Sequence, residues 1–236
     1  MEEHITSAFF DPAFVKRNLM GPNCLLLAEE FLGRIDLADA GRVLDLGCGT
    51  GLTSMYLASR LSARIVGYDL WIDATDNFER LRRHGFDDRV MPVHGDVDAM
   101  PFARGYFDAL VCIDAYHHFG AREGFLETAL APFLRPGGLF AIVVPGLKKD
   151  FDAGVPEEMR PFWQEDMNMY SAVWWADLIG RSPAVRLEEV FSLACHDRAW
   201  REWLSCDHPY AVRDRDMMRA EAGQYFDTIG LVARVV

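Results

Sequence analysis

The nine residues Val-Leu-Asp-Leu-Gly-Cys-Gly-Thr-Gly at positions 43–51 decide the fold. The apolar start of this stretch predicts a buried strand, and a helix-period segment begins at Leu52, so the glycines form the turn between them. Glycine at 47, 49 and 51 tolerates positive φ and lets the backbone approach a ligand closely. The helix that follows points its first amides at anionic groups of that ligand. The stretch therefore predicts a strand–turn–helix unit that binds a small molecule.

This turn differs from the fingerprint of dinucleotide-binding proteins. The pattern G-x-G-x-x-G/A requires glycine or alanine at position 52, where this sequence has Leu52. Asp45 lies two residues before the first glycine, and its carboxylate would repel a pyrophosphate. The same carboxylate suits a cationic ligand, so the residues alone favour a cationic ligand over a dinucleotide.

Outward from the turn, apolar runs alternate with helix-period segments between residues 42 and 145, the pattern of a parallel sheet with helices on its faces. We expect strands at 42–47, 64–70, 90–95, 107–114, 139–145, 185–193 and 224–235, and helices at 23–32, 52–60, 72–84, 122–133 and 198–204. The turn at 135–138, Arg-Pro-Gly-Gly, should end the helix before it. The chain thus reads as one α/β domain over residues 1–236, with an N-terminal helical extension (1–40) and a helical insert (146–182) between the fifth and sixth strands.

Further motifs follow the glycine turn at the ends of the later strands. Asp69 ends the second strand, Gly-Asp-Val follows the third at 95–97, and Leu-Arg-Pro-Gly-Gly precedes the fifth at 134–138. Together with residues 43–51, these motifs resemble class I S-adenosylmethionine-dependent methyltransferases, in particular small-molecule enzymes of the ubiquinone and menaquinone type. The resemblance is clear from residue 42 to about 145 and looser over the last two strands. It implies a Rossmann-like seven-stranded sheet, mostly parallel with an antiparallel last strand, and S-adenosylmethionine as cofactor.

The resemblance also assigns roles to residues. Asp45 and the glycine turn would hold the methionine part of the cofactor, and Asp69 would accept from both ribose hydroxyls. Asp96 would accept from the adenine amino group, although a helix N-cap role remains open for it. The cofactor-binding residues implied are Asp45, Gly47, Cys48, Gly49, Thr50, Gly51, Asp69, Leu70, Gly95, Asp96, Val97 and Asp114, the last at the end of the fourth strand beside the sulfonium. Trp71 packs against adenine or belongs to the first turn of the next helix.

Catalytic candidates follow the fourth strand. Methyl transfer requires an aligned nucleophile and, where the acceptor carries a proton, a base. Tyr116, His117 and His118 lie in this loop, which resembles the histidine-containing loop of small-molecule methyltransferases, and histidine titrates near neutrality. The alternative is that these side chains pack on the sheet.

Several observations bear on the acceptor. The loop lacks the D/N-P-P-Y/F signature of DNA- and protein-amide methylation and the Pro-Cys nucleophile of cytosine methylation, and a formal charge of −12 disfavours nucleic acid. We therefore expect a small-molecule acceptor. In the insert, Tyr170, Trp174 and Trp175 form either a substrate wall or a helical core. The N-terminal segment, with His4, Phe9, Phe10 and Phe14, closes over the cofactor or packs on the surface.

Composition points to a cytoplasmic protein without a metal or a membrane partner. The five cysteines show no C-x-x-C spacing, the N-terminus lacks a signal pattern, and no uncharged apolar run approaches the length of a membrane span. Two alternatives stay open: methylenation of a lipid, as in cyclopropane fatty-acid synthases, and a regulatory protein that binds the cofactor without turnover. The sequence also leaves open which acceptor is used and which of its atoms is methylated. The oligomeric state is open as well, with a dimer among the alternatives.

Overall fold

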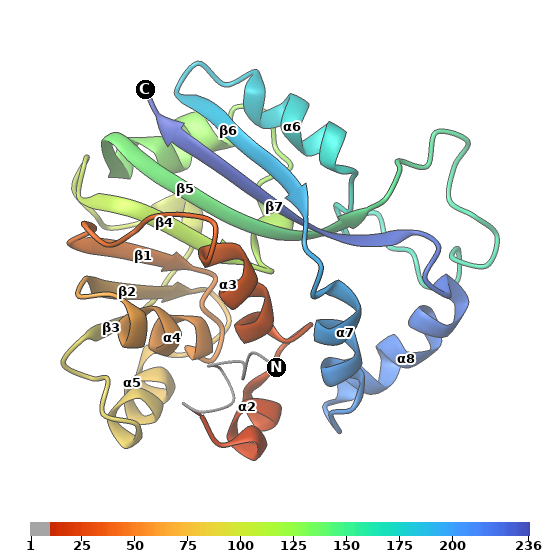
Figure 1. The fold of residues 1–236 in the computed structure, drawn as a ribbon, viewed down its shortest axis with the longest axis horizontal. Helices are drawn as coiled ribbons and strands as arrows, with labels where there is room; N and C mark the ends of the chain where they lie inside the picture. The colour runs from red at the N-terminus through yellow and green to blue at the C-terminus, as the bar shows by residue number, and fades with distance from the viewer. Residues whose placement is uncertain (1–9) are drawn as a thin grey trace.

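The computed structural model describes residues 10–236 and contains a seven-stranded sheet in the order β3-β2-β1-β4-β5-β7-β6 (Figure 1). Its strands are β1 (Arg42–Leu46), β2 (Arg64–Asp69), β3 (Val90–His94), β4 (Phe107–Ile113), β5 (Leu134–Leu147), β6 (Val185–Ser192) and β7 (Phe226–Val235). The first five strands pair in parallel, and β7 runs antiparallel to both β5 and β6. The predicted fold class is therefore confirmed, and the carboxyl ends of β1 to β5 lie at one edge of the sheet.

The helices agree with the predictions in the core and differ outside it. They are α2 (Pro12–Asn18), α3 (Cys24–Leu32), α4 (Leu52–Arg60), α5 (Ala74–Arg83), α6 (Ala172–Gly180), α7 (His196–Leu204) and α8 (Pro209–Glu221). The predictions missed α2 and α8. Charged residues lie on several sides of α8, so no apolar stripe indicated a helix there. Its beginning is nevertheless defined by His208, whose Nδ1 accepts from the Tyr210 amide at 3.3 Å, and by Pro209 in the first turn.

The segment before β5 departs from the expected helix and turn. In place of a helix over 122–133, one π-helical turn (Leu126–Leu130) is followed by a 3-10 turn (Ala131–Phe133). The predicted turn at 135–138 lies inside β5 as a bulge, because Phe107 pairs with Leu134 and Ala109 pairs with Leu139. Gly137 supplies the positive φ of 73° that this bulge requires.

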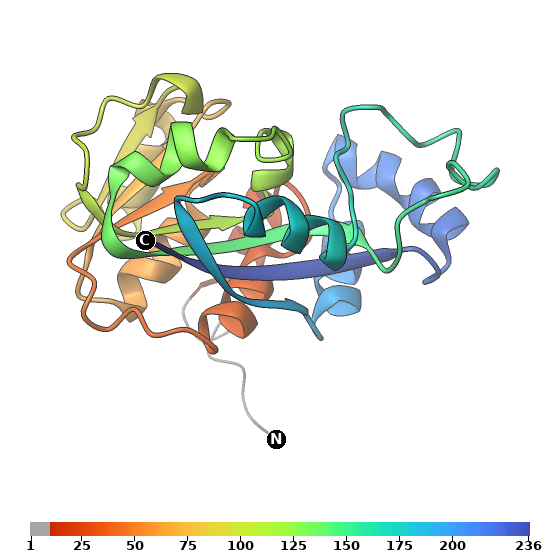
Figure 2. The same ribbon diagram turned by 90° about the horizontal axis from the view of Figure 1, so that it is seen from above.

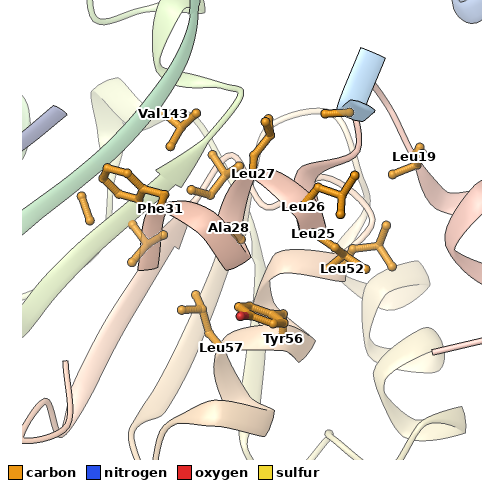
Figure 3. Close-up of a cluster of buried hydrophobic side chains, with 14 of the residues drawn as sticks. Leu19, Leu25, Leu26, Leu27, Ala28, Phe31, Leu52, Tyr56, Leu57 and Val143 are labelled. Atoms are coloured by element: carbon orange, nitrogen blue, oxygen red, sulfur yellow. The ribbon is translucent and has the colours of Figure 1, made fainter. Parts of the chain in front are cut away.

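The sheet is covered on both faces. Val43 and Val111 face the layer that contains α3 and α4, whereas Leu44 and Leu110 face the layer that contains α6. This alternation follows from the two-residue period of a strand. Figure 3 shows the leucines of α3 packed against α4 and the sheet, with Leu27 completely buried.

The insert between β5 and β6 is helical only over α6, and residues 148–170 follow an irregular path. The loop is held at one end by Asp150, which accepts from the amide of Ser171 at 2.7 Å and from its hydroxyl at 2.5 Å. Further along, Tyr225 donates to Glu158 at 2.5 Å. The loop and α8 lie side by side beyond the end of β5 (Figures 1 and 2).

The N-terminal residues named above separate into two groups. His4 and Phe9 lie outside the described residues. Phe10 and Phe14 are buried, and their rings lie 6.4 Å from Phe86 and 4.0 Å from His84, which favours the packing alternative for them. The end of α2 does reach the glycine turn, because Thr50 donates to the carbonyl of Asn18, the last residue of this helix, at 2.7 Å.

Candidate active site

The glycine turn between β1 and α4 forms a close-fitting cradle. Gly47, Gly49 and Gly51 have φ values of 71°, 53° and 84°, which favour glycine. A Cβ on Gly47 would collide with the Cβ of Ala115, and one on Gly49 would lie 2.9 Å from the sulfur of Met20. The conformation therefore favours glycine at all three positions, and the limited space adds to this at Gly47 and Gly49.

Asp45 lies beneath this cradle with one oxygen satisfied and one free. The side chain is 1% exposed, and its Oδ2 accepts from the hydroxyls of Thr53 and Ser54, each at 2.6 Å. Its Oδ1 is buried without a hydrogen-bond partner in the described part of the chain. Burial raises the pKa of Asp45 to about 6, although the two hydroxyls oppose the shift. A buried carboxylate oxygen without a donor fits a ligand that carries a cationic or N–H group.

The raised pKa of Asp45 predicts that the free energy of unfolding depends on pH. Since the folded-state pKa lies above the ordinary value of 3.8, the stability linked to this group is present below pH 3.8 and is lost as the pH rises through about 6. At neutral pH the loss amounts to at most about 3 kcal/mol. The free energy of unfolding of Asp45→Asn relative to the natural protein should therefore rise between about pH 4 and pH 7. Urea denaturation of both proteins across this range measures it, and a constant difference would contradict the prediction.

Asp69 connects the second motif to the first. Its Oδ2 accepts from the Gly49 amide at 2.8 Å, and its Oδ1 accepts from the amides of Trp71 and Ile72 at 2.7 and 2.9 Å. A carboxylate offers about four acceptor positions, so capacity remains for ligand hydroxyls. The structure thus brings Asp69 and the glycine turn into direct contact.

The third motif lies at the end of β3. Asp96 is exposed and caps the short turn that follows, with Oδ1 accepting from the Asp98 amide at 2.9 Å. The Asp96 carbonyl accepts from the Tyr68 hydroxyl at 2.9 Å, and a Cβ on Gly95 would collide with that hydroxyl. One oxygen of Asp96 therefore has the N-cap contact, and the other is available to a ligand.

Two apolar side chains stand at this edge without cover from the described chain. Leu70 is 52% exposed and Trp71 is 64% exposed. The Trp71 ring lies 4.9 Å from the ring of His118. This contact joins the end of β2 to the loop after β4, and sequence reasoning missed it because the two residues are 47 positions apart.

The three catalytic candidates differ in their placement. His118 is exposed, whereas His117 is 8% exposed and its Nδ1 has no partner in the described chain. Burial lowers the pKa of His117 well below its ordinary value; it also lowers the pKa of His118, where Asp166 and Asp69 oppose the shift. The two rings lie 3.9 Å apart. Both imidazoles are therefore neutral near pH 7, and of the two only His118 is exposed to a bound molecule.

Tyr116 faces the core. It is 1% exposed, its ring lies 5.5 Å from Phe119 and 5.8 Å from Trp175, and burial raises the pKa of its hydroxyl. This placement argues against the catalytic role predicted for Tyr116 and supports packing.

The aromatic residues of the insert also separate. Trp175 is completely buried between α6 and the sheet, which favours the core alternative for this residue. Tyr170 and Trp174 are half-buried and stack at 3.7 Å. The insert reaches the histidine loop through Asn168, whose Nδ2 donates to the His117 carbonyl at 3.0 Å. No motif marks Asn168, and only the tertiary path of the loop reveals it.

Asp114 stands at the carboxyl end of β4 with an unusual backbone. Its φ of 60° lies in the left-handed region, which aspartate tolerates better than most residues. A Cβ on Gly21 would collide with its Oδ2, so the N-terminal segment touches this carboxylate. Burial, followed by the charge of Asp214 on α8, raises the pKa of Asp114 to about 7.

Within residues 10–236, no helix has the length and apolar character needed to cross a membrane. The same part of the chain contains no group of three histidine, cysteine or acidic side chains placed to hold a metal ion.

Comparison with known proteins gives one family match and many relatives. A family described as "Methyltransferase domain" matches residues 43–138. The chain is 31% identical over 135 residues to Methyltransferase GfsG of Streptomyces halstedii, which covers 56% of this chain and 48% of that protein. It is 32% identical over 119 residues to the sterol 24-C-methyltransferase of Yarrowia lipolytica, and this match covers 49% of this chain and 30% of that protein. The chain thus spans about half the length or less of these curated relatives.

The fold is shared with solved structures. Geranyl diphosphate C-methyltransferase from Streptomyces coelicolor A3(2), in complex with Mg2+, geranyl diphosphate and S-adenosyl-L-homocysteine, superposes with a TM-score of 0.67. The two are 15% identical, and the superposition covers 95% of this chain and 76% of that one. The matched family region contains the glycine turn, Asp69, Asp96 and the histidine loop, and it leaves α3, α6, α7 and α8 outside.

Proposed function

We propose that this chain, which belongs to the class I S-adenosylmethionine-dependent methyltransferases, transfers a methyl group from S-adenosylmethionine to a small-molecule acceptor. The observation that carries the proposal is the joint placement of three features at one sheet edge. These are the glycine cradle, the free buried Oδ1 of Asp45 and the carboxylate of Asp69 bonded to Gly49.

The residues of the site fit the cofactor. Asp45 Oδ1 would accept a hydrogen bond from the ammonium of the cofactor's methionine part. The rest of the methionine part would lie against the cradle formed by Gly47, Cys48, Gly49, Thr50 and Gly51. Asp69 would receive the ribose hydroxyls. Leu70, Gly95, Asp96 and Val97 would surround the adenine, with the free oxygen of Asp96 accepting from its amino group. The bound cofactor supplies an electrophilic methyl group.

His118 is the residue that would accept a proton from the acceptor. It is exposed at the sheet edge beside Trp71, whereas His117 is enclosed and its loop is held by Asn168. We assign His117 a positioning role for this loop. Tyr170 and Trp174 remain candidates for the acceptor wall.

A small neutral or cationic acceptor suits the charge of the molecule. The formal charge of −12 and the carboxylates at the sheet edge disfavour phosphate-rich polymers. The cysteines are free, which is consistent with the proposed cytoplasmic location.

Binding of S-adenosylhomocysteine tests the cofactor proposal. The ligand should raise the melting temperature of the natural protein, whereas NAD should leave it unchanged. Asp69→Asn should lower the affinity about tenfold or more, because one oxygen that accepts hydroxyl protons becomes a donor. Asp76→Asn, an exposed carboxylate on α5, serves as the matched control. Calorimetric titration measures the affinities; stabilisation by NAD alone, or equal affinity in the Asp69 variant, would contradict the proposal.

A further inference from the structure

Asn168 in the insert combines two features that few side chains supply together. Its backbone φ is 48°, in the left-handed region that asparagine adopts more readily than most residues. Its side-chain amide donates to the His117 carbonyl at 3.0 Å. Glycine would suit the backbone but offer no donor, whereas glutamine would offer a donor and strain the backbone. Asparagine thus meets both the backbone conformation and the contact with the histidine loop.

The group that Asn168 contacts is the peptide between His117 and His118. This peptide lies in the short 3-10 turn that follows β4. Its amide, that of His118, donates to the Ala115 carbonyl at 3.1 Å, and its carbonyl accepts from Asn168. Because a peptide group is planar, these two hydrogen bonds hold the plane that ends at the His118 Cα. They therefore fix the direction in which the His118 side chain leaves the backbone.

The segment that carries Asn168 is itself fixed to the rest of the molecule. On either side of it, Met167 and Met169 pack against the apolar cluster of the layer that contains α3. Immediately afterwards, the Tyr170 carbonyl accepts from the amide of Leu147, at the end of β5, at 3.1 Å. Asn168 therefore reaches the histidine loop from a held segment.

The same segment carries the candidates for the acceptor wall. Tyr170, two residues after Asn168, stacks on Trp174 at 3.7 Å. The hydrogen bond from Asn168 joins this segment to a loop that lies 51 positions away in the sequence. In that loop, the His118 ring lies 4.9 Å from Trp71. A continuous series of contacts thus runs from the acceptor wall to the proposed proton acceptor.

We infer that Asn168 is a positioning residue: by holding the peptide before His118, it fixes the proton acceptor relative to the acceptor wall of Tyr170 and Trp174. The inference rests on the proposed function. A base acts only within hydrogen-bond reach of the proton that it removes, and a misplacement of about 1 Å can lower a rate by about 100-fold. Asn168 contacts the backbone of the loop and takes no part in the transfer itself.

Titration of the His118 imidazole tests its placement without an acceptor and without turnover. Burial lowers the pKa of His118 from 6.5, while the facing carboxylates of Asp166 and Asp69 oppose the shift, and the His117 ring lies 3.9 Å away. Asn168→Gly keeps the backbone conformation and removes the donor. The loop should then open to solvent, and the pKa of His118 should rise toward 6.5. NMR spectroscopy measures this pKa, with the resonance assigned by its loss in His118→Gln.

Hydrogen exchange reports on the backbone of the same variant. The His118 amide, bonded within the turn, should exchange about tenfold faster in Asn168→Gly, because the turn loses one of its two fixed points. The melting temperature should change by less than about 4 °C, since one hydrogen bond is lost and the left-handed backbone is relieved. A folded variant with a faster exchanging turn separates local release from unfolding.

Two control variants make the result specific. Asp166→Asn keeps the Asn168 bond and removes a carboxylate that raises the pKa of His118, so this pKa should fall instead of rise. Tyr225→Phe removes the hydrogen bond to Glu158, elsewhere in the same insert. It should leave the pKa of His118 and the exchange of its amide unchanged.

Kinetics with a small-molecule acceptor found by screening connect the placement to the reaction. Asn168→Gly should lower kcat about 10- to 100-fold and change the affinity for S-adenosylhomocysteine less than about threefold. The low-pH limb of kcat/KM should move to higher pH together with the pKa of His118. A residue that only stabilises the fold would not move this limb.

Three outcomes would overturn the inference. The first is an unchanged pKa of His118 and unchanged exchange in Asn168→Gly. The second is an equal shift in Tyr225→Phe, because the effect would then come from general loosening of the insert. The third is a kcat that stays at the natural value although the pKa has shifted. Failure of the natural protein to bind S-adenosylhomocysteine contradicts the proposed function instead, because the titration and the exchange are measured on the free protein.

Discussion

Replacing Gly47 by alanine should destabilise the protein by about 2–5 kcal/mol and weaken binding of S-adenosylhomocysteine about 30-fold or more. The φ of 71° costs an L-residue about 1–2 kcal/mol, and the new Cβ would collide with Ala115, the residue that follows β4 by two positions. Relief of that collision requires either the glycine turn or the loop after β4 to move. Since the proposed ligand lies between them, both stability and affinity should fall.

Gly85 provides the control for this prediction. Its φ is 73°, close to that of Gly47, yet a Cβ there meets nothing within 4 Å. Gly85→Ala should therefore cost about 1 kcal/mol through conformation alone and leave affinity unchanged. Urea denaturation and calorimetric titration compare the two variants. If Gly47→Ala loses no more stability and affinity than Gly85→Ala, the close fit of the turn against Ala115 contributes to neither, and the prediction is wrong.

The glycine turn was predictable because its requirements are local. Positive φ at Gly47 and Gly49, the apolar strand before them and the helix after them all depend on neighbours in sequence. The same holds for β1 to β4, whose bounds agree with the expected ones within one residue at each end. In contrast, α8 carries charge on several sides and is held by contacts such as that of Trp203 with Asp214, which no local pattern announces.

Residue type alone could not assign the aromatic side chains to the correct face. Tyr116 was a catalytic candidate and Trp175 a candidate for the substrate wall, with packing in the core as the alternative for each. Both rings point into the layer beneath the sheet, where they lie 5.8 Å apart. Conversely, the contact of Trp71 with His118 and the bond from Asn168 to the histidine loop depend on the tertiary path of the chain.

Replacing His118 by glutamine should lower the rate of methyl transfer by about 10²- to 10⁴-fold, the usual contribution of a general base. Glutamine keeps a polar side chain of similar size beside Trp71 but cannot accept a proton. The rate is measured as transfer of labelled methyl groups from S-adenosylmethionine to a small-molecule acceptor found by screening. His196→Gln is the control. Burial lowers the pKa of His196 as it lowers that of His118, but the His196 ring contacts the Thr228 hydroxyl, with its Nδ1 2.8 Å from Oγ1.

The pH dependence of the reaction separates a base from a residue that only packs. Burial lowers the pKa of His118 from its ordinary value of 6.5, so the neutral, proton-accepting form predominates at pH 6.5 and above. The value of kcat/KM should therefore rise with pH through a pKa below 6.5, and this limb should disappear in His118→Gln and persist in His196→Gln. Turnover that survives replacement of both His117 and His118, with the low-pH limb intact, would contradict the prediction and assign the proton to another group.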